Sequence, residues 1–160
     1  MSLFPPHEQQ AIRLSRDDVN EPLSCYSQHG FDLDDAHWPS VEHYYQAMKF
    51  DQGDYRERIR QADHPQGARK LGRARFKKIR KDWDAVREVV MTRAVYIKCR
   101  THDSVADALL NTGEETIIES SSYDYYWGCG RDGRGHNNYG KVLMNVRNKL
   151  REELAGQQHN

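Results

Sequence analysis

The chain has 160 residues, of which 37% are hydrophobic, 30% charged and 10% aromatic. This length predicts one domain with a sizeable core, and the aromatic content argues against disorder. The formal net charge is zero, so overall charge favours no class of partner. No segment is apolar enough for a signal peptide or a membrane span, so we expect a cytoplasmic protein without a membrane partner.

The three cysteines, Cys25, Cys99 and Cys129, lie far apart and form no CxxC pair. Such usage fits a reducing compartment and argues against a disulfide scaffold or a zinc module. The eight histidines show no HxxxH or HExxH spacing. The histidine spacing therefore predicts no metal site.

Basic residues are concentrated in the middle of the chain. Residues 56–100 hold fifteen of the 24 Lys and Arg, whereas residues 1–55 hold three. A basic middle can bind phosphate, but solvated Lys and Arg on long helices are the commoner explanation.

The first half of the chain predicts short helices after a polar start. Residues 1–22 contain three prolines and predict a flexible, loosely tied lead-in to a domain over 23–155. Ser40 is suited to N-cap a helix over 41–51. A charged helix over 54–62 and one or two further turns before Gly72 follow.

The second half has a clearer pattern. Apolar residues at spacings of three and four predict an amphipathic helix over 82–99. A helix over 105–112 follows, capped by Asp103 or Ser104 and ended by a left-handed Gly113. Residues 116–121 predict a strand, 122–140 a long loop and 141–154 a final helix. The predicted fold is α+β, a compact and mostly helical domain with a small β-sheet.

Glu42, Gln46 and Lys49 share one face of the helix predicted over 41–51, among aromatic neighbours. This polar line is either a thin wet edge or the wall of a pocket. Glu42 and Asp124 are the two carboxylates that lie among aromatics, and such groups stabilise an oxocarbenium-like state in glycosidic cleavage. A structural ion pair is the alternative for Glu42. Lys49 is a candidate for an ion pair, a phosphate contact or an amine nucleophile.

Residues 127–135 (WGCGRDGRG) match GxGxxG, but no helix opens at the last glycine, so a dinucleotide site is not predicted. The glycines predict a close approach of backbone to a ligand, or a surface Ω-loop. Nearby aromatics, together with Trp83, are candidates for stacking on a planar heterocycle. The helical pattern around Trp83 favours core packing for that residue.

Three blocks together resemble the NADAR family of YbiA-like N-glycosidases. They are residues 38–50 (WPSVEHYYQAMKF), 72–95 (GRARFKKIRKDWDAVREVVMTRAV) and 124–147 (DYYWGCGRDGRGHNNYGKVLMNVR), in the order typical of the family. The resemblance implies a compact α+β domain that hydrolyses an N-glycosidic bond.

The resemblance also implies substrates and residue roles. Members act on ribosylaminopyrimidine 5-phosphates, early intermediates of riboflavin biosynthesis, releasing ribose 5-phosphate and the pyrimidine. Others remove ADP-ribose from guanine in nucleic acid. The implied partner is thus a phosphorylated ribosyl small molecule or, alternatively, ADP-ribosylated nucleic acid. The implied catalytic residues are Glu42, Lys49 and Asp124, and the implied substrate-binding residues are Trp83, Trp127, Asn137, Arg73, Arg75, Lys77 and Lys78, the last four for phosphate. No cofactor is expected, because glycosidic cleavage with carboxylates or an amine requires none.

The chain departs from the family at Cys25, where members often carry an asparagine. A weak thiol donor there replaces an amide that would hydrogen-bond a ribose hydroxyl. Two other classes of function remain open on the residues alone. One is a non-catalytic module that binds ADP-ribose or a nucleotide, and the other is a nucleic-acid binder that uses the basic middle.

Overall fold

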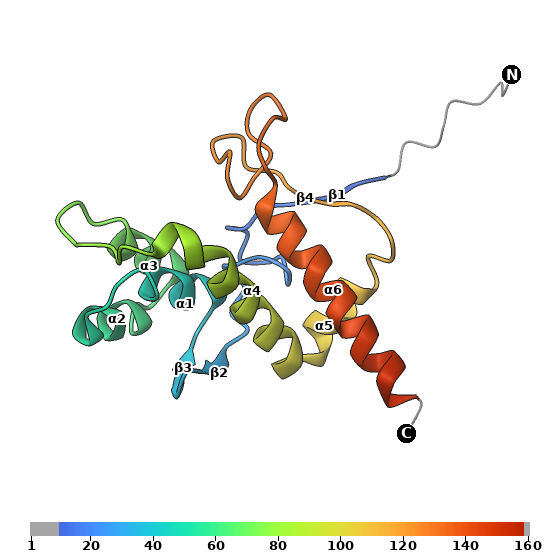
Figure 1. The fold of residues 1–160 in the computed structure, drawn as a ribbon, viewed down its shortest axis with the longest axis horizontal. Helices are drawn as coiled ribbons and strands as arrows, with labels where there is room; N and C mark the ends of the chain where they lie inside the picture. The colour runs from blue at the N-terminus through green and yellow to red at the C-terminus, as the bar shows by residue number, and fades with distance from the viewer. Residues whose placement is uncertain (1–9, 159–160) are drawn as a thin grey trace, which may run out of the picture.

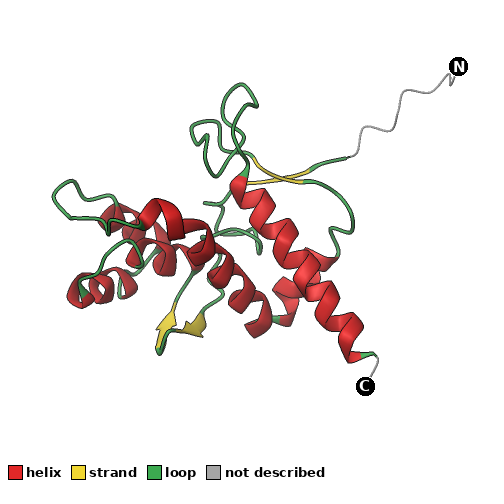
Figure 2. Cartoon of the chain, in the orientation of Figure 1, coloured by secondary structure: helices red, strands yellow, loops and turns green. Residues whose placement is uncertain are grey.

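The computed structural model describes residues 10–158 as six helices and two pairs of short strands, a compact α+β arrangement that confirms the predicted fold class. Three short helices gather at one end, a long helix runs through the middle, and the last helix packs against it (Figure 1). Figure 2 shows how much of the remainder is loop. The helices are α1 (Val41–Ala47), α2 (Gly53–Arg60), α3 (Pro65–Gly72), α4 (Trp83–Thr101), α5 (Asp103–Leu110) and α6 (Asn138–Gln157).

Helix α1 packs against α2, α3 and α4. The predicted N-cap is present: Ser40 Oγ accepts a hydrogen bond from the His43 backbone N–H. The helix ends at Ala47, earlier than predicted, and one further turn carries the chain to Lys49, whose N–H donates to the Gln46 carbonyl. All seven residues of α1 are buried, polar ones included.

Strands β2 (Phe31–Leu33) and β3 (Ala36–Trp38) form an antiparallel hairpin that the sequence did not predict. Its two-residue turn, Asp34 and Asp35, has φ values of 53° and 61°. Both values fit a type I′ turn, in which aspartate is tolerated. The Trp38 indole N–H donates to the Leu33 carbonyl at 2.8 Å, which fixes the hairpin immediately before α1.

Strands β1 (Ile12–Leu14) and β4 (Ile117–Glu119) pair in parallel, with Arg13 opposite Ile118. The strand predicted over 116–121 is therefore present, in shorter form. Residues 10–22 are not a loose lead-in throughout, because β1 is paired with β4. The sequence did not reveal this pairing, since the partner strand lies about a hundred positions away and no local pattern specifies it. The prediction for residues 1–9 lies outside the described residues.

The later helices match their predicted positions with shifted ends. Helix α4 covers the region predicted from its amphipathic spacing. Helix α5 begins at Asp103 with His102 as N-cap residue, so the predicted side-chain caps, Asp103 and Ser104, are wrong. Gly113 has φ 62°, the predicted left-handed conformation. Helix α6 begins three residues earlier than predicted, at Asn138.

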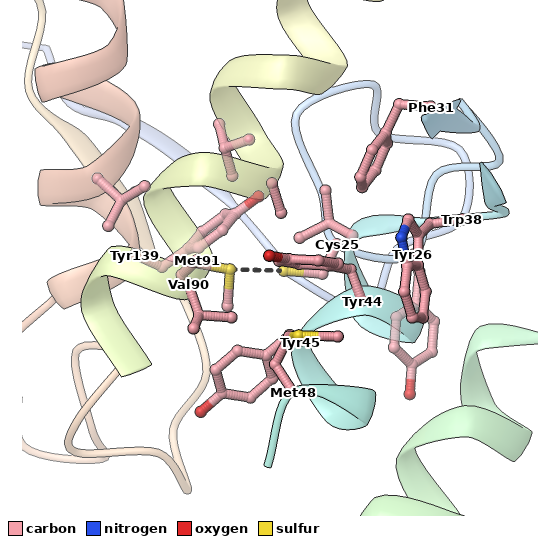
Figure 3. Close-up of a cluster of buried hydrophobic side chains, with 14 of the residues drawn as sticks. Cys25, Tyr26, Phe31, Trp38, Tyr44, Tyr45, Met48, Val90, Met91 and Tyr139 are labelled. Carbon is pink, nitrogen blue, oxygen red and sulfur yellow. Dashed lines mark hydrogen bonds between the residues drawn. The ribbon is translucent and has the colours of Figure 1, made fainter. Parts of the chain in front are cut away.

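The hydrophobic core lies between α1, α4 and α6 and is rich in aromatic and sulfur-containing side chains (Figure 3). Tyr44 and Tyr139 are fully buried, and Cys25 Sγ lies 3.9 Å from Met91 Sδ. In the described part of the chain, no helix has the length and apolar character needed to cross a membrane.

Candidate active site

A cavity of about 200 Å³ opens where α1, α3, the start of α4 and the loop before α6 meet. The polar face of α1 forms one wall, since Glu42, Gln46 and Lys49 all line it. The polar line predicted from the sequence is thus the wall of a pocket. The other lining residues are Arg16, Tyr45, Arg69, Arg73, Arg87, Asp124, Tyr126 and Trp127.

Glu42 is 1% exposed and held through one oxygen. Oε1 accepts hydrogen bonds from Arg69 Nε at 2.9 Å and from Gln46 Nε2 at 2.7 Å. Burial acts to raise the pKa of Glu42, but the charge and hydrogen bonds of these partners outweigh it, so the pKa lies below its usual value. Glu42 is therefore an ionised carboxylate at neutral pH, suited to accept a proton or stabilise a cation rather than to donate a proton.

Lys49 lies on the same wall and has few partners. Its Nζ reaches the Gly72 carbonyl only at 3.5 Å and lies 5.6 Å from the centre of the Tyr45 ring. Burial lowers the pKa of Lys49 to about 8, against the opposing effect of Glu42. A substantial fraction of the amine is consequently neutral near physiological pH, as an amine nucleophile requires.

Asp124 and Arg16 form another part of the cavity lining. Arg16 Nη2 donates to Asp124 Oδ2 at 2.5 Å. The other carboxylate oxygen accepts the backbone N–H groups of Tyr126 and Trp127 at 2.9 and 2.8 Å. The same side chain thus shapes the loop and presents a carboxylate to the cavity.

Buried polar atoms without a hydrogen-bond partner concentrate at this cavity. Six such side-chain atoms occur among residues 10–158, and four belong to residues that line it. Unpaired buried polar groups are costly, so a group of them at one cavity indicates a site that a polar ligand completes. The four are Arg16 Nε, Glu42 Oε2, Gln46 Oε1 and Arg87 Nε.

The two tryptophans predicted to stack on substrate have different positions. Trp127 lines the cavity, and its indole N–H donates to the Tyr45 hydroxyl at 3.1 Å. Trp83 is buried behind Tyr45, with ring centres 5.1 Å apart, and does not line the cavity. Trp83 therefore supports the Tyr45 wall by packing, as its helical pattern favoured.

The N-terminal strand pair positions Arg16. Its backbone N–H donates to Oε1 of Glu119, a fully buried residue at the end of β4. The Arg16 carbonyl in turn accepts the N–H of Cys25, and the Cys25 carbonyl accepts the N–H of Glu42 at 3.1 Å. Strand β1 and α1 are thus joined through backbone at the cavity.

Cys25, where the resemblance led us to expect an asparagine, contributes only its backbone to these contacts. Its thiol faces Met91 in the core (Figure 3), and burial raises its pKa to about 12. The neutral thiol lies in the core and does not line the cavity.

The glycine-rich loop packs against its own chain. A Cβ on Gly128 would lie 2.4 Å from Glu119 Oε2, and a Cβ on Gly135 would lie 2.3 Å from the Gly128 carbonyl oxygen. The close backbone approach expected from these glycines is therefore intramolecular. Asn137 has a left-handed φ of 50°, and its amide binds the backbone of Ile117 and Glu119. It ties the start of α6 to β4 outside the cavity.

Of the four basic residues predicted to meet phosphate, Arg73 lines the cavity and the other three do not. Arg75 is exposed, and Lys77 lies 4.5 Å from the centre of the Tyr55 ring. Lys78 is exposed on the loop between α3 and α4, away from the cavity.

The sequence did not single out several cavity residues, Arg16, Arg69 and Arg87 among them. Nothing in the sequence marked Arg16 as a cavity residue, because it lies in the segment predicted to be a polar lead-in. The signal for Arg69 was weak: the residue lies on a short basic helix that follows a helix whose polar face contains Glu42. Gly72 marks that packing: a Cβ there would lie 1.9 Å from Gln46 Oε1, so α3 can approach α1 only with glycine at this position.

Comparison with known proteins identifies the family of this chain. The family model described as the NADAR domain matches residues 9–151. The chain belongs to the NADAR family. The match includes β1 and every residue that lines the cavity, so the resemblance seen in the three sequence blocks is confirmed and extends to the N-terminal strand.

Relatives within this family carry enzyme names. An N-glycosidase of Nostoc punctiforme is 40% identical over 143 residues, covering 86% of this chain and 92% of the relative. The N-glycosidase YbiA of Escherichia coli is 42% identical over 123 residues, covering 77% and 74%. The chloroplastic riboflavin biosynthesis protein PYRR of Zea mays is 34% identical, covering 91% of this chain but 26% of that protein.

A solved structure shares the fold. The NMR structure of E. coli YbiA superposes with a TM-score of 0.83 at 35% sequence identity, covering 94% of this chain and 90% of that one. The α+β arrangement around the cavity is thus that of a NADAR-family structure.

Proposed function

We propose that this NADAR-family protein hydrolyses the N-glycosidic bond of ribosylaminopyrimidine 5-phosphates at the cavity, releasing ribose 5-phosphate and the pyrimidine. It is a hydrolase acting on N-glycosyl bonds, the activity in the names of its relatives from N. punctiforme and E. coli. The riboflavin biosynthesis name of the Zea mays relative supports the choice of substrate. The observation that carries the proposal is Glu42, a buried, ionised carboxylate with one oxygen unpaired beside a lysine of lowered pKa.

One route uses water directly. The bond between C1 and the pyrimidine nitrogen breaks, its electron pair leaves with the nitrogen, and the ring gains oxocarbenium character. The Glu42 carboxylate stabilises this charge and accepts a proton from the water that attacks C1. Glu42 then passes that proton to the departing amino nitrogen, so the pyrimidine leaves as a neutral amine and the carboxylate is restored.

The other route passes through an imine on Lys49. The ribosylamine opens to an imine at C1, the neutral Lys49 amine adds there, and the pyrimidine amine leaves as the lysine imine forms. Water then hydrolyses the lysine imine to the aldehyde of ribose 5-phosphate and restores the amine. Glu42 or Asp124 moves the protons. The lowered pKa of Lys49 and its sparse hydrogen bonding favour this route.

The alternative substrate, guanine carrying ADP-ribose in nucleic acid, has one observation in its favour. The loop that supplies Asp124 to the cavity also exposes Tyr123 and Tyr125, and exposed aromatic side chains can stack on bases. The same catalytic groups serve either substrate.

The decisive experiment compares wild type with Glu42→Gln on both substrates. Each protein is incubated with a ribosylaminopyrimidine 5-phosphate and, separately, with an ADP-ribosylated guanine oligonucleotide, and released base is measured. Glu42→Gln keeps the shape but removes the negative charge, so we expect turnover to fall about 10²–10⁴-fold, the range typical of general acid–base groups.

A matched control is Glu114→Gln, an exposed glutamate that does not line the cavity. It should retain wild-type turnover. Release of base by the folded Glu42→Gln protein at the wild-type rate would refute the role of Glu42. No release from either substrate by wild type, together with ligand-dependent thermal stabilisation, would favour the non-catalytic binding module.

A further inference from the structure

The cations around the cavity fall into two groups. Arg69 and Arg16 each pair with a carboxylate, Glu42 and Asp124 respectively, and both are largely buried. Arg73 and Arg87 line the same cavity, yet neither donates a side-chain hydrogen bond to any of residues 10–158. The two carboxylates are thus already neutralised, and the cavity keeps a surplus of positive charge.

Arg87, in the second turn of α4, is held by stacking rather than by hydrogen bonds. Its guanidinium carbon lies 3.3 Å from the centre of the Tyr126 ring. The nearest carboxylate, on the exposed Asp84, is 3.9 Å from Arg87 Nε, beyond hydrogen-bond distance. The Nε atom is itself buried without a partner.

Tyr126 is a fixed platform for this stack. Its hydroxyl donates to Glu88 Oε1 at 2.9 Å, and its backbone N–H donates to Asp124 Oδ1 at 2.9 Å. Stacking occupies the flat face of a guanidinium and leaves the N–H groups at its edge available. Arg87 therefore presents a preorganised fork of donors with no acceptor in the described protein.

Such a fork matches a phosphate group, which takes bidentate hydrogen bonds from arginine. We propose that Arg87, held on Tyr126, forms with Arg73 the subsite for the phosphate on C5 of the substrate ribose. The inference rests on the proposed function insofar as that substrate carries a phosphate at this position. It makes Arg87 the residue that distinguishes phosphorylated from dephosphorylated ribosides.

The test compares Arg87→Ala and Arg87→Lys with wild type on a ribosylaminopyrimidine 5-phosphate and on its dephosphorylated form. A charge-assisted hydrogen bond contributes strongly enough that Arg87→Ala should lower kcat/KM for the phosphorylated substrate by about 10–100-fold. For the dephosphorylated substrate the change should stay below about threefold. Arg87→Lys keeps a charge without the fork, so it should recover only part of the loss.

The control is Arg131→Ala. Arg131 also faces a tyrosine, with its guanidinium carbon 5.9 Å from the Tyr123 ring centre, but it lies outside the cavity. Its removal should leave the preference for the phosphorylated substrate unchanged. Equal losses by Arg87→Ala on both substrates, or no loss on either, would overturn the assignment.

Binding of ribose 5-phosphate, measured against ribose by calorimetry, separates this inference from the proposed function. If wild type cleaves neither riboside, the proposed function fails, but the phosphate subsite is still tested. Wild type should then bind ribose 5-phosphate more tightly than ribose, and Arg87→Ala should abolish that difference. Equal affinity of wild type for the two sugars would overturn the subsite directly. Thermal melting of each variant checks that folding is intact.

Discussion

Two basic regions of this molecule, the loop over 74–81 and the cavity, differ in their surroundings. The loop over 74–81 carries Lys77 and Lys78 beside Phe76, which is fully exposed. The cavity draws its cations instead from distant segments, with Arg16 after β1 and Arg69 on α3. The loop has the higher local density of charge, but in the cavity the cations pair with the buried Glu42 and the half-buried Asp124, beside polar atoms without a partner.

Convergence and burial of charged groups, rather than a high local density of charge, therefore indicate a binding site. Exposed charges are screened by water and salt within a Debye length of about 8–10 Å at physiological ionic strength. Charges in a buried site are screened far less and so hold one another in place. The comparison predicts large effects from cavity substitutions and small ones from the loop.

The largest effect is expected from Arg69→Met. This change leaves the ionised Glu42 buried with Gln46 as its remaining direct partner. Breaking a buried ion pair in this way typically costs about 3–5 kcal/mol, so the free energy of unfolding in urea should fall by that order. The pKa of Glu42 should rise at the same time, because the charge that opposes the effect of burial is gone.

A double variant sharpens this prediction. Glu42→Gln combined with Arg69→Met removes both charges, so it should be more stable than Arg69→Met alone. If the losses of unfolding free energy in the two single variants simply add in the double variant, breaking the buried ion pair is not the cause of the destabilisation. Arg80→Met is the matched control from the loop, since Arg80 pairs with the exposed Asp82. The free energy of unfolding of this variant should stay close to that of wild type.

A smaller effect, on rate, is expected from pH. Lys49 has a pKa of about 8 because it is buried, and only its neutral form is a nucleophile. As pH rises through 8 the neutral fraction rises, so kcat/KM should climb about tenfold per unit below pH 8 and level off above it. Glu42 is ionised throughout this range and adds no slope.

Trapping provides the second readout for Lys49. Borohydride added during turnover should reduce the lysine imine and attach the ribose covalently to wild type, and Lys49→Arg should prevent this. A flat profile between pH 6.5 and pH 9 without trapping would contradict the imine route and leave direct attack by water, with Glu42 as base.

The part of the site that the sequence predicted is the part formed by short-range geometry. Glu42 and Lys49 are placed in the cavity by helical spacing within ten residues, and Asp124 and Trp127 by one turn of loop. Ser40 capped its helix for the same reason, because a cap depends only on residues nearby. The α+β class followed from the same local patterns.

The remainder depends on contacts between distant segments. Arg16 reaches Asp124 only because β1 pairs with β4, and no pattern in three residues of strand specifies that pairing. Asn137 lies beside the cavity loop in sequence, yet its left-handed backbone turns its amide toward Ile117 and Glu119. Arg87 looks like any solvated helical arginine until Tyr126 is placed against it.

The smallest effect is expected from the loop. Lys77 and Lys78 were predicted from the sequence to bind phosphate, but they lie outside the cavity, and Lys77 faces the Tyr55 ring. Replacing both with alanine should change the free energy of unfolding by no more than about 0.5 kcal/mol, as is usual for exposed sites. The KM for the phosphorylated substrate should stay within about twofold of wild type at moderate salt, where exposed charges are screened. A rise in KM comparable to that of Arg87→Ala would place the loop in contact with phosphate, and burial would no longer separate the two basic regions.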